Sequence, residues 1–181
     1  RLLVLASNGV WAIVGTEGGG FTATNFTVEK VSNFGCVAPS SVVVDGKSIY
    51  YWGQGAIYRL APNQFGELEV ADLTTQSLKQ VYAGIIEFHK VRCSGTINKH
   101  TNVIHWIFSN SGVSELDSKF ITEFRFDINR NSLFHMEWAY EPGSLPMVLG
   151  SFMLSSTSYY EVNGGVAPVG GFAPPNTLKY W

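Results

Sequence analysis

The sequence predicts a mainly β protein made of antiparallel meanders, and three observations favour this fold class. Short runs of β-branched and aromatic residues alternate with turns that contain glycine, asparagine or aspartate. The opening pattern LVLASNGVWAI returns as IYYWGQGAIYRL, with Gly9 falling on Gly55. Only one stretch, near residues 73–84, has the residue spacing of a helix.

The first predicted element is a hairpin of residues 2–6 and 10–14. Its strands flank Ser7-Asn8-Gly9, a short connection in which Asn8 or Gly9 can take a positive φ. Three segments are expected next: a glycine-rich loop at 15–21, a strand at 22–31 and a turn at 32–39.

The opening pattern returns between Ser40 and Pro62 as three antiparallel strands. The turns between them are Asp45-Gly46 and Gly53-Gln54-Gly55. A strand-rich repeat with a period of roughly 40 to 50 residues is typical of β-propeller blades. The sequence therefore predicts a whole or partial β-propeller.

The segment near 73–84 interrupts this pattern as a short helix. Asp72 or Thr74 is expected to cap its start and Gly84 to end it. No other helix is predicted. Its buried face is expected to carry four residues at i, i+3, i+4 and i+7, namely Leu78, Val81, Tyr82 and Ile85.

Strands are predicted to resume after the helix. One hairpin covers 89–109 and turns at Asn98 to Asn102, and a second covers 119–140 and turns at Asn129-Arg130-Asn131. Within the second hairpin, Ile121, Phe124 or Phe126, and Ile128 alternate with polar neighbours over part of the length, which predicts a half-buried strand.

The C-terminal part is expected to begin another blade at 146–162, continue as a loop at 163–176, and start a strand at 178–181. The domain prediction is one β-propeller-like domain, or a fragment of one, over residues 1–181. Its blade-like units are expected at about 1–45, 46–95, 96–145 and, in part, 146–181. The start at Arg1 without a methionine and the strand-like end suggest a piece of a longer protein.

Composition excludes several classes of function. Charged residues are only 14% of the 181 residues and the net charge is -2, so there is no basic field to hold nucleic acid. No apolar run is long enough to span a bilayer, and no secretory signal is recognisable. Low charge on a folded chain favours a surface that is covered by neighbouring subunits, hence an oligomer.

The two cysteines, Cys36 and Cys93, are expected to be buried thiols, and a disulfide between them is the alternative.

The sequence offers no catalytic, cofactor-binding or metal-binding residues, so we expect no enzyme and no cofactor. His100 and His105 are five residues apart and point to opposite faces if they share a strand, which disfavours a common metal. The stretch GTEGGG lacks the lysine and hydroxyl residue of a phosphate-binding loop. Two carboxylate pairs, Glu67/Glu69 and Glu115/Asp117, are expected to be exposed; an unrecognised glycosidase pair remains a third alternative.

Aromatic residues are the remaining candidates for a binding surface, because their rings can stack on sugars or bases. Most of them lie inside predicted strands, where packing in a core or an interface is the commoner use. The residues concerned are Trp11, Tyr50, Tyr51, Trp52, Tyr58, Trp106, Trp138 and Tyr140.

Five stretches in order resemble the tail tubular protein B, or tail nozzle protein, of short-tailed bacteriophages. They are LLVLASNGVWAIVG, NFTVEKVSNFGCVAPSSVVVDGKSIYYWGQGAIYRL, LTTQSLKQVYAGI, RCSGTINKHTNVIHWIFSN and FITEFRFDINRNSLFHMEWAY. The resemblance extends over roughly residues 2–160. It rests on the order of the stretches and on the single helix between blades, since no one motif is diagnostic.

The resemblance implies a β-propeller-type virion protein that forms a hexameric ring at the end of the phage tail, with DNA leaving through the central channel. Its implied partners are copies of itself and other tail proteins, namely an upstream adaptor ring and tail fibres. It implies no catalytic residues, no specific recognition of nucleic acid and no membrane. The protein would be made in the host cytoplasm and reside in the virion. The alternative function is a carbohydrate- or receptor-binding β-propeller module that uses exposed tryptophans.

Overall fold

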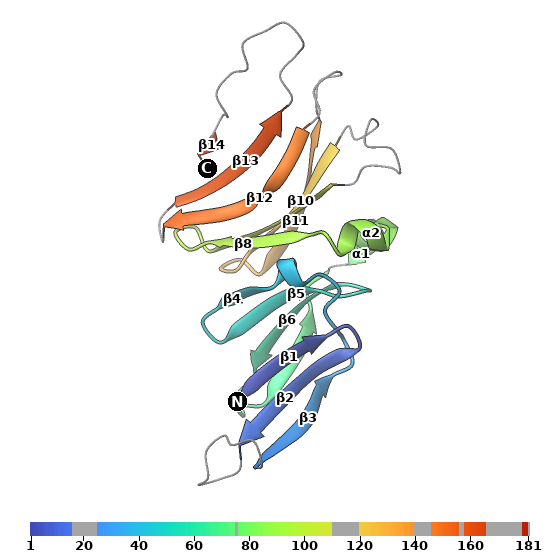
Figure 1. The fold of residues 1–181 in the computed structure, drawn as a ribbon, viewed down its shortest axis with the longest axis vertical. Coiled ribbons are helices and arrows are strands. Elements are labelled where there is room, and N and C mark those ends of the chain that lie inside the picture. Colours follow the sequence, from blue (N-terminus) through green and yellow to red (C-terminus); the bar gives the residue numbers. More distant parts are fainter. Residues whose placement is uncertain are drawn as a thin grey trace, which may run out of the picture. The chain divides into compact units, whose positions relative to one another are not determined.

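The computed structural model describes residues 1–15, 25–74, 76–109, 120–139, 146–155, 158–165 and 179–180. The chain divides into two compact units, Arg1–Ala83 and Gly84–Trp181. The predicted mainly β class is confirmed: the described strands form four antiparallel sheets, and helices are few (Figure 1).

The first sheet is a three-stranded meander in the order β1-β2-β3. Its strands are β1 (Leu2–Ala6), β2 (Gly9–Gly15) and β3 (Phe26–Ser32). The predicted opening hairpin is confirmed, with Ala6 paired to Gly9 across the turn. Gly9 has φ +150°, a backbone region that disfavours other residues. The predicted strand at 22–31 is observed as β3 from Phe26 onward. Its first residues, 22–24, and residues 16–21 of the predicted glycine-rich loop lie outside the described residues.

The second sheet is a four-stranded meander in the order β4-β5-β6-β7 and follows a short 3-10 helix, η1 (Pro39–Ser41). Its strands are β4 (Val43–Asp45), β5 (Ser48–Trp52), β6 (Ile57–Pro62) and β7 (Leu68–Asp72). The three predicted strands are confirmed, and β7 is an addition. The turn at Gly46 uses a positive φ of 57°. The repeated hairpin β5–β6 has a longer turn than β1–β2, closed by Gly53 N donating to Ala56 O at 2.9 Å.

One hydrophobic core joins these two sheets. Its buried members are Val10, Cys36, Tyr51, Ala56, Tyr58 and Leu60. Leu3 and Leu5 of β1 and Leu68 and Val70 of β7 pack against it. One face of the β1–β3 sheet therefore belongs to the interior of the first unit.

The predicted helix is confirmed as α1 (Gln76–Gly84), but its cap and its face differ from the expectation. The Thr74 hydroxyl accepts a hydrogen bond from Ile57 N at 3.0 Å, so it serves the sheet rather than the helix. Asp72 Oδ1 accepts from Thr74 N at 2.7 Å in a local turn. Tyr82 is buried, whereas Val81 of the predicted inner face is 37% exposed.

The structure contains a second helix, so the prediction of a single helix is wrong. It is α2 (Glu87–Lys90), and it takes up residues that were assigned to the start of the hairpin at 89–109. His89 and Lys90 are buried in its last turn, at the position where the sequence predicts the start of the hairpin. The helix is four residues long, too short to show a helical period in the sequence.

The second unit contains the other two sheets. A four-stranded meander runs in the order β11-β10-β9-β8, and a three-stranded one in the order β12-β13-β14 (Figure 1). Its strands are β8 (Ser94–Asn98), β9 (Val103–Ser109), β10 (Phe120–Asp127), β11 (Ser132–Ala139), β12 (Pro146–Ser155), β13 (Ser158–Gly165) and β14 (Lys179–Tyr180). Both predicted hairpin turns are confirmed, with positive φ at Asn102 and Asn131. β12 also contacts β8 and β9.

The sheets begin at Leu2, Val43, Ser94 and Pro146, so successive meanders start 41, 51 and 52 residues apart. The expected unit boundaries at 45/46 and 95/96 fall inside the β4–β5 hairpin and inside β8. Most of the predicted loop at 163–176 lies outside the described residues.

Candidate functional site

The four-stranded sheet of the second unit carries a buried charged cluster on one face. Glu123 of β10 is 1% exposed. Its carboxylate accepts hydrogen bonds from Arg125 Nε at 2.8 Å and Arg125 Nη2 at 2.9 Å. His105 Nδ1 of β9 lies 2.6 Å from Glu123 Oε1.

Strand register brings these three residues together. Arg125 pairs with His105 across the β9–β10 ladder, and Glu123 is two residues from Arg125 on the same strand. Paired residues and residues at i, i+2 share one face of a sheet. The opposite face is apolar and buried; it includes Ile104, Trp106, Phe108, Phe124, Phe126 and Leu133.

The hydrogen bonds decide the charge state of Glu123. Burial acts to raise the pKa of this carboxyl, but the hydrogen bonds from His105 and Arg125 outweigh burial and leave the pKa below its ordinary value. Glu123 is therefore ionised at neutral pH and acts as an acceptor. A carboxylate in this state is unsuited to donate a proton as a general acid.

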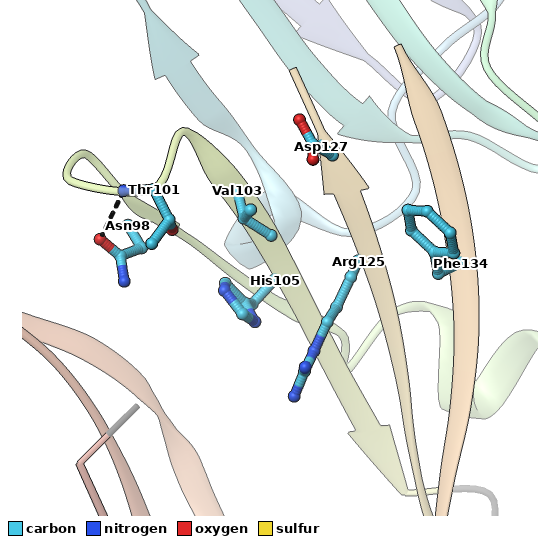
Figure 2. A pocket seen from close by; sticks show the side chains of 7 residues that line it. All are labelled: Asn98, Thr101, Val103, His105, Arg125, Asp127 and Phe134. Atoms are coloured by element: carbon cyan, nitrogen blue, oxygen red, sulfur yellow. Dashed lines mark hydrogen bonds between the residues drawn. The ribbon is translucent and has the colours of Figure 1, made fainter. Parts of the chain in front are cut away.

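A hollow of about 270 Å³ adjoins the cluster (Figure 2). It is lined by Asn98, Thr101, Val103, His105, Arg125, Asp127 and Phe134. In Figure 2, the His105 and Arg125 side chains lie next to each other between the Asn98 turn and β11, and Asn98 Oδ1 accepts from Thr101 N at 3.3 Å.

The geometry of this hollow argues against glycoside hydrolysis there. Glu123 and Asp127 share the sheet face but are four residues apart on one strand, which separates them by about 13 Å. Glycosidases place their two carboxyl groups about 5 to 9.5 Å apart. Asp127 is instead used by the next turn, where its carboxylate accepts from Arg130 N at 3.0 Å.

The structure separates the two histidines considered as metal ligands. His100 lies in the β8–β9 turn, where its backbone N donates to Asn98 Oδ1 at 3.0 Å, and His105 lies in the charged cluster. Within the described part of the chain, no three His, Cys, Asp or Glu residues are placed to hold a metal ion. Glu67 and Glu69 are exposed, as predicted. The pair Glu115/Asp117 lies outside the described residues.

The aromatic candidates whose side chains are described serve mainly in the core, as predicted. Trp11 is half-buried, with Lys30 Nζ 5.2 Å from its ring centroid. The side chains of Trp138 and Tyr140 lie outside the described part. The buried members are Tyr50, Tyr51, Trp52, Tyr58 and Trp106.

Both cysteines are buried thiols, as predicted, and they form no disulfide. Burial raises the pKa of the Cys36 thiol, although hydrogen bonding with the Ala38 backbone and the Ser41 side chain partly opposes this. A buried thiol with a raised pKa is chemically inert.

Sequence reasoning missed Glu123 and Arg125. Their signal was present: both are charged, they alternate with Phe124 and Phe126, and they lie in an otherwise apolar strand. Charged residues at i and i+2 of a central strand share a face and need partners when buried. The partner His105 becomes visible only with the register of β9 against β10.

A second surface feature lies on the β1–β3 sheet, on the face away from the core. By strand register, Leu2 and Val4 of β1 share this face with Val28 and Phe26 of β3. These four side chains are between 40% and 53% exposed. Trp11 and Ile13 of β2 lie between them and are half-buried. We call this set the outer face; a contiguous exposed apolar patch of this kind marks an interaction surface.

No protein-family model matches the chain. None of the curated proteins matches it either. Among the helices that the structure describes, none has the length and apolarity needed to cross a membrane.

Proposed function

We propose that the protein is a structural subunit of a bacteriophage tail, of the tubular or nozzle type, which works by assembling into a ring and not by catalysis. The observation that carries the proposal is the outer face of the β1–β3 sheet. One side of the sheet contributes to the core of the first unit. The other side exposes Leu2, Val4, Phe26 and Val28, and Lys30 lies at its edge with its ammonium 5.2 Å from the centroid of the Trp11 ring.

The occupant we assign to the outer face is the next copy of this chain in a ring. In a closed head-to-tail ring, each subunit binds the next subunit with one surface and the previous subunit with a different surface. Full burial of an aliphatic or aromatic side chain contributes about 1.5–3 kcal/mol, so four half-exposed ones contribute on the order of 4 kcal/mol. That is comparable with the cost of association, about 4–15 kcal/mol, so ring closure and further contacts have to supply the rest.

The other parts of the proposal follow from the resemblance and the charge. Successive antiparallel meanders suit the blades of a β-propeller, which we propose as the complete architecture. A net charge of -2 suits a conduit that passes DNA without holding it, since each neutralised phosphate adds affinity. The proposed partners are further copies, the upstream tail ring and tail fibres, in a virion assembled in the host cytoplasm.

The assembly is tested by light scattering and negative-stain imaging of the purified protein, alone and mixed with the upstream tail ring protein. Wild type is expected to give hexameric rings in at least one condition. Val28→Glu places a charge in the outer face and is expected to prevent them. Val44→Glu is the matched control, because Val44 is 57% exposed on β4, a strand of the other sheet.

Two results would refute the proposal. If the wild-type protein stays monomeric in both conditions, it does not assemble into a ring and the proposal is wrong. Rings that survive Val28→Glu and dissociate with Val44→Glu remove the outer face as the contact between subunits.

A further inference from the structure

The first unit contains a hollow of about 390 Å³ where the two repeated hairpin turns meet. Ser7 comes from the β1–β2 turn, Gln54 and Gly55 come from the β5–β6 turn, and Asn33 and Phe34 follow β3. Its floor includes Tyr58 of β6. This hollow is separate from the outer face and has no part in the proposed ring contact.

Phe34 is an exposed aromatic side chain on a fixed backbone. The side chain is 52% exposed. Its backbone N donates to Ser32 Oγ at 3.0 Å, and its carbonyl oxygen accepts from the Tyr51 hydroxyl at 2.8 Å. One face of its ring stacks on Tyr58, with centroids 4.9 Å apart and an interplanar angle of 21°. The ring is thus held in place and turns its other face outward.

The neighbouring glycine fixes the same segment further. A Cβ at Gly35 would overlap the backbone carbonyl oxygens of Ser7 and Ala6. The next residue, Cys36, donates its N–H to Ala6 O at 2.9 Å. The chain around Phe34 therefore lies directly against the β1–β2 turn, and only glycine permits this approach. A site built in this way loses little conformational entropy when a ligand binds.

The chemistry of the lining selects the ligand class. The polar side chains of the lining residues are two amides, Asn33 and Gln54, and two hydroxyls, Ser7 and Tyr58. Amides and hydroxyls both donate and accept hydrogen bonds, as sugar hydroxyls do. The lining holds no charged side chain, which disfavours phosphates, nucleotides and acidic or basic peptides. A pyranose ring presents an apolar C–H face, and this face matches the outward face of an aromatic ring.

We propose that this hollow is a binding site for a neutral saccharide, with the sugar ring seated on Phe34 and its hydroxyl groups hydrogen-bonded by Asn33, Gln54 and Ser7. The volume falls within the range of small-ligand pockets, about 300–1,000 Å³. Through this site, the subunits of the proposed ring also bind a surface that carries glycans. It uses Phe34, whereas Trp52 and Trp106 are fully buried and unable to stack on a sugar.

The test is a glycan array of neutral mono- to tetrasaccharides, followed by calorimetric titration of the best binder. Phe34→Leu keeps an apolar contact with Tyr58 and removes the aromatic face, and Asn33→Ala removes one amide. Each is expected to weaken binding at least tenfold. Phe65→Ala is the matched control, since Phe65 is an exposed phenylalanine (79%) in the β6–β7 turn and should bind within twofold of wild type. Circular dichroism checks that each variant is folded.

Three results would overturn the proposal. The first is a wild-type protein, in both its monomeric and assembled forms, that binds no neutral glycan at millimolar concentration. The second is binding that Phe34→Leu and Asn33→Ala leave unchanged. The third is dispersal of the rings by Phe34→Leu, which would show that the hollow receives a segment of the neighbouring subunit and no saccharide. Since Val28→Glu tests the ring and Phe34→Leu tests the hollow, the two proposals can fail separately.

Discussion

Replacing Glu123 by glutamine removes the charge of the buried cluster and keeps the size of the side chain. The wild-type carboxylate accepts from Arg125 Nε, Arg125 Nη2 and His105 Nδ1. A glutamine amide has a single acceptor oxygen, so its NH2 group would face one of these donors. Arg125, with 22% of its side chain exposed, would also lose its counter-charge.

The magnitude follows from the burial of the two partners. Breaking a buried ion pair by removing one partner costs about 3–5 kcal/mol. Arg125 retains part of its hydration, which places the expected loss at about 2–3 kcal/mol, since exposure weakens such pairs. This is a large fraction of the roughly 5–15 kcal/mol by which a domain is stable.

The loss should depend on pH in a defined direction. Burial acts to raise the pKa of Glu123, yet the hydrogen bonds from His105 and Arg125 leave it below the ordinary value of 4.5. A carboxyl with a lower pKa in the folded state stabilises the protein above its unfolded pKa, and this contribution is lost as the pH falls through the folded pKa. The stabilities of wild type and Glu123→Gln should therefore converge below about pH 4.5.

The assay is urea unfolding followed by far-UV circular dichroism, repeated from about pH 7 to about pH 3. Glu69→Gln is the control, because Glu69 is exposed on β7 and its replacement should change the free energy of unfolding by less than about 0.5 kcal/mol. A loss below about 1 kcal/mol for Glu123→Gln at pH 7, or stability curves that stay parallel to low pH, would refute the reasoning.

Three further predictions concern packing and thiol chemistry. Gly35→Ala should lower the free energy of unfolding by at least about 2 kcal/mol, because the new Cβ meets two backbone carbonyl oxygens. Gly84→Ala, where a Cβ meets nothing within 4 Å, should raise it by about 0.5 kcal/mol; thermal melts that rank the two variants the other way contradict this. Tyr82→Phe removes the hydroxyl that donates to the buried Gly53 carbonyl and should cost about 1–2 kcal/mol in urea unfolding; an unchanged midpoint would show that water replaces it. Cys36 and Cys93 should be unreactive toward an aromatic disulfide reagent in the folded protein and both react in denaturant; rapid native labelling would show that one is accessible.

Local signals allowed much of the fold to be predicted. Turn residues located the hairpins at Gly9, Gly46, Asn102 and Asn131, because a positive φ restricts which residues a turn accepts. The helix α1 was recognisable from the i, i+3, i+4, i+7 spacing of Leu78, Val81, Tyr82 and Ile85. Tyr82 is buried in the helix, and Ile85 is buried directly after the helix ends at Gly84.

Elements whose stability comes from tertiary contacts were missed. β7 is preceded by Glu67 and includes Glu69, and it becomes a strand because Leu68 and Val70 pack on the core. α2 has only four residues, too few for a helical spacing of apolar residues to be recognised in the sequence. Thr74 was taken for a cap because the sequence does not show that Ile57 N reaches its hydroxyl.

The candidate sites were harder to predict than the fold. The charged cluster depends on the register of β9 against β10. The hollow at Phe34 depends on the approach of Gly35 to the β1–β2 turn. Both are contacts between segments distant in the sequence, and neither leaves a local motif.

The sequential order of strands in every described sheet has a consequence for the protein's synthesis. A ribosome adds roughly 5–20 residues per second, whereas a hairpin closes in about 1–10 μs. Each strand emerging from the exit tunnel therefore finds its partner already present, and pairing keeps pace with translation. Among the described strands, none has to stay open for a partner made much later, which is the interval in which unpaired edges aggregate.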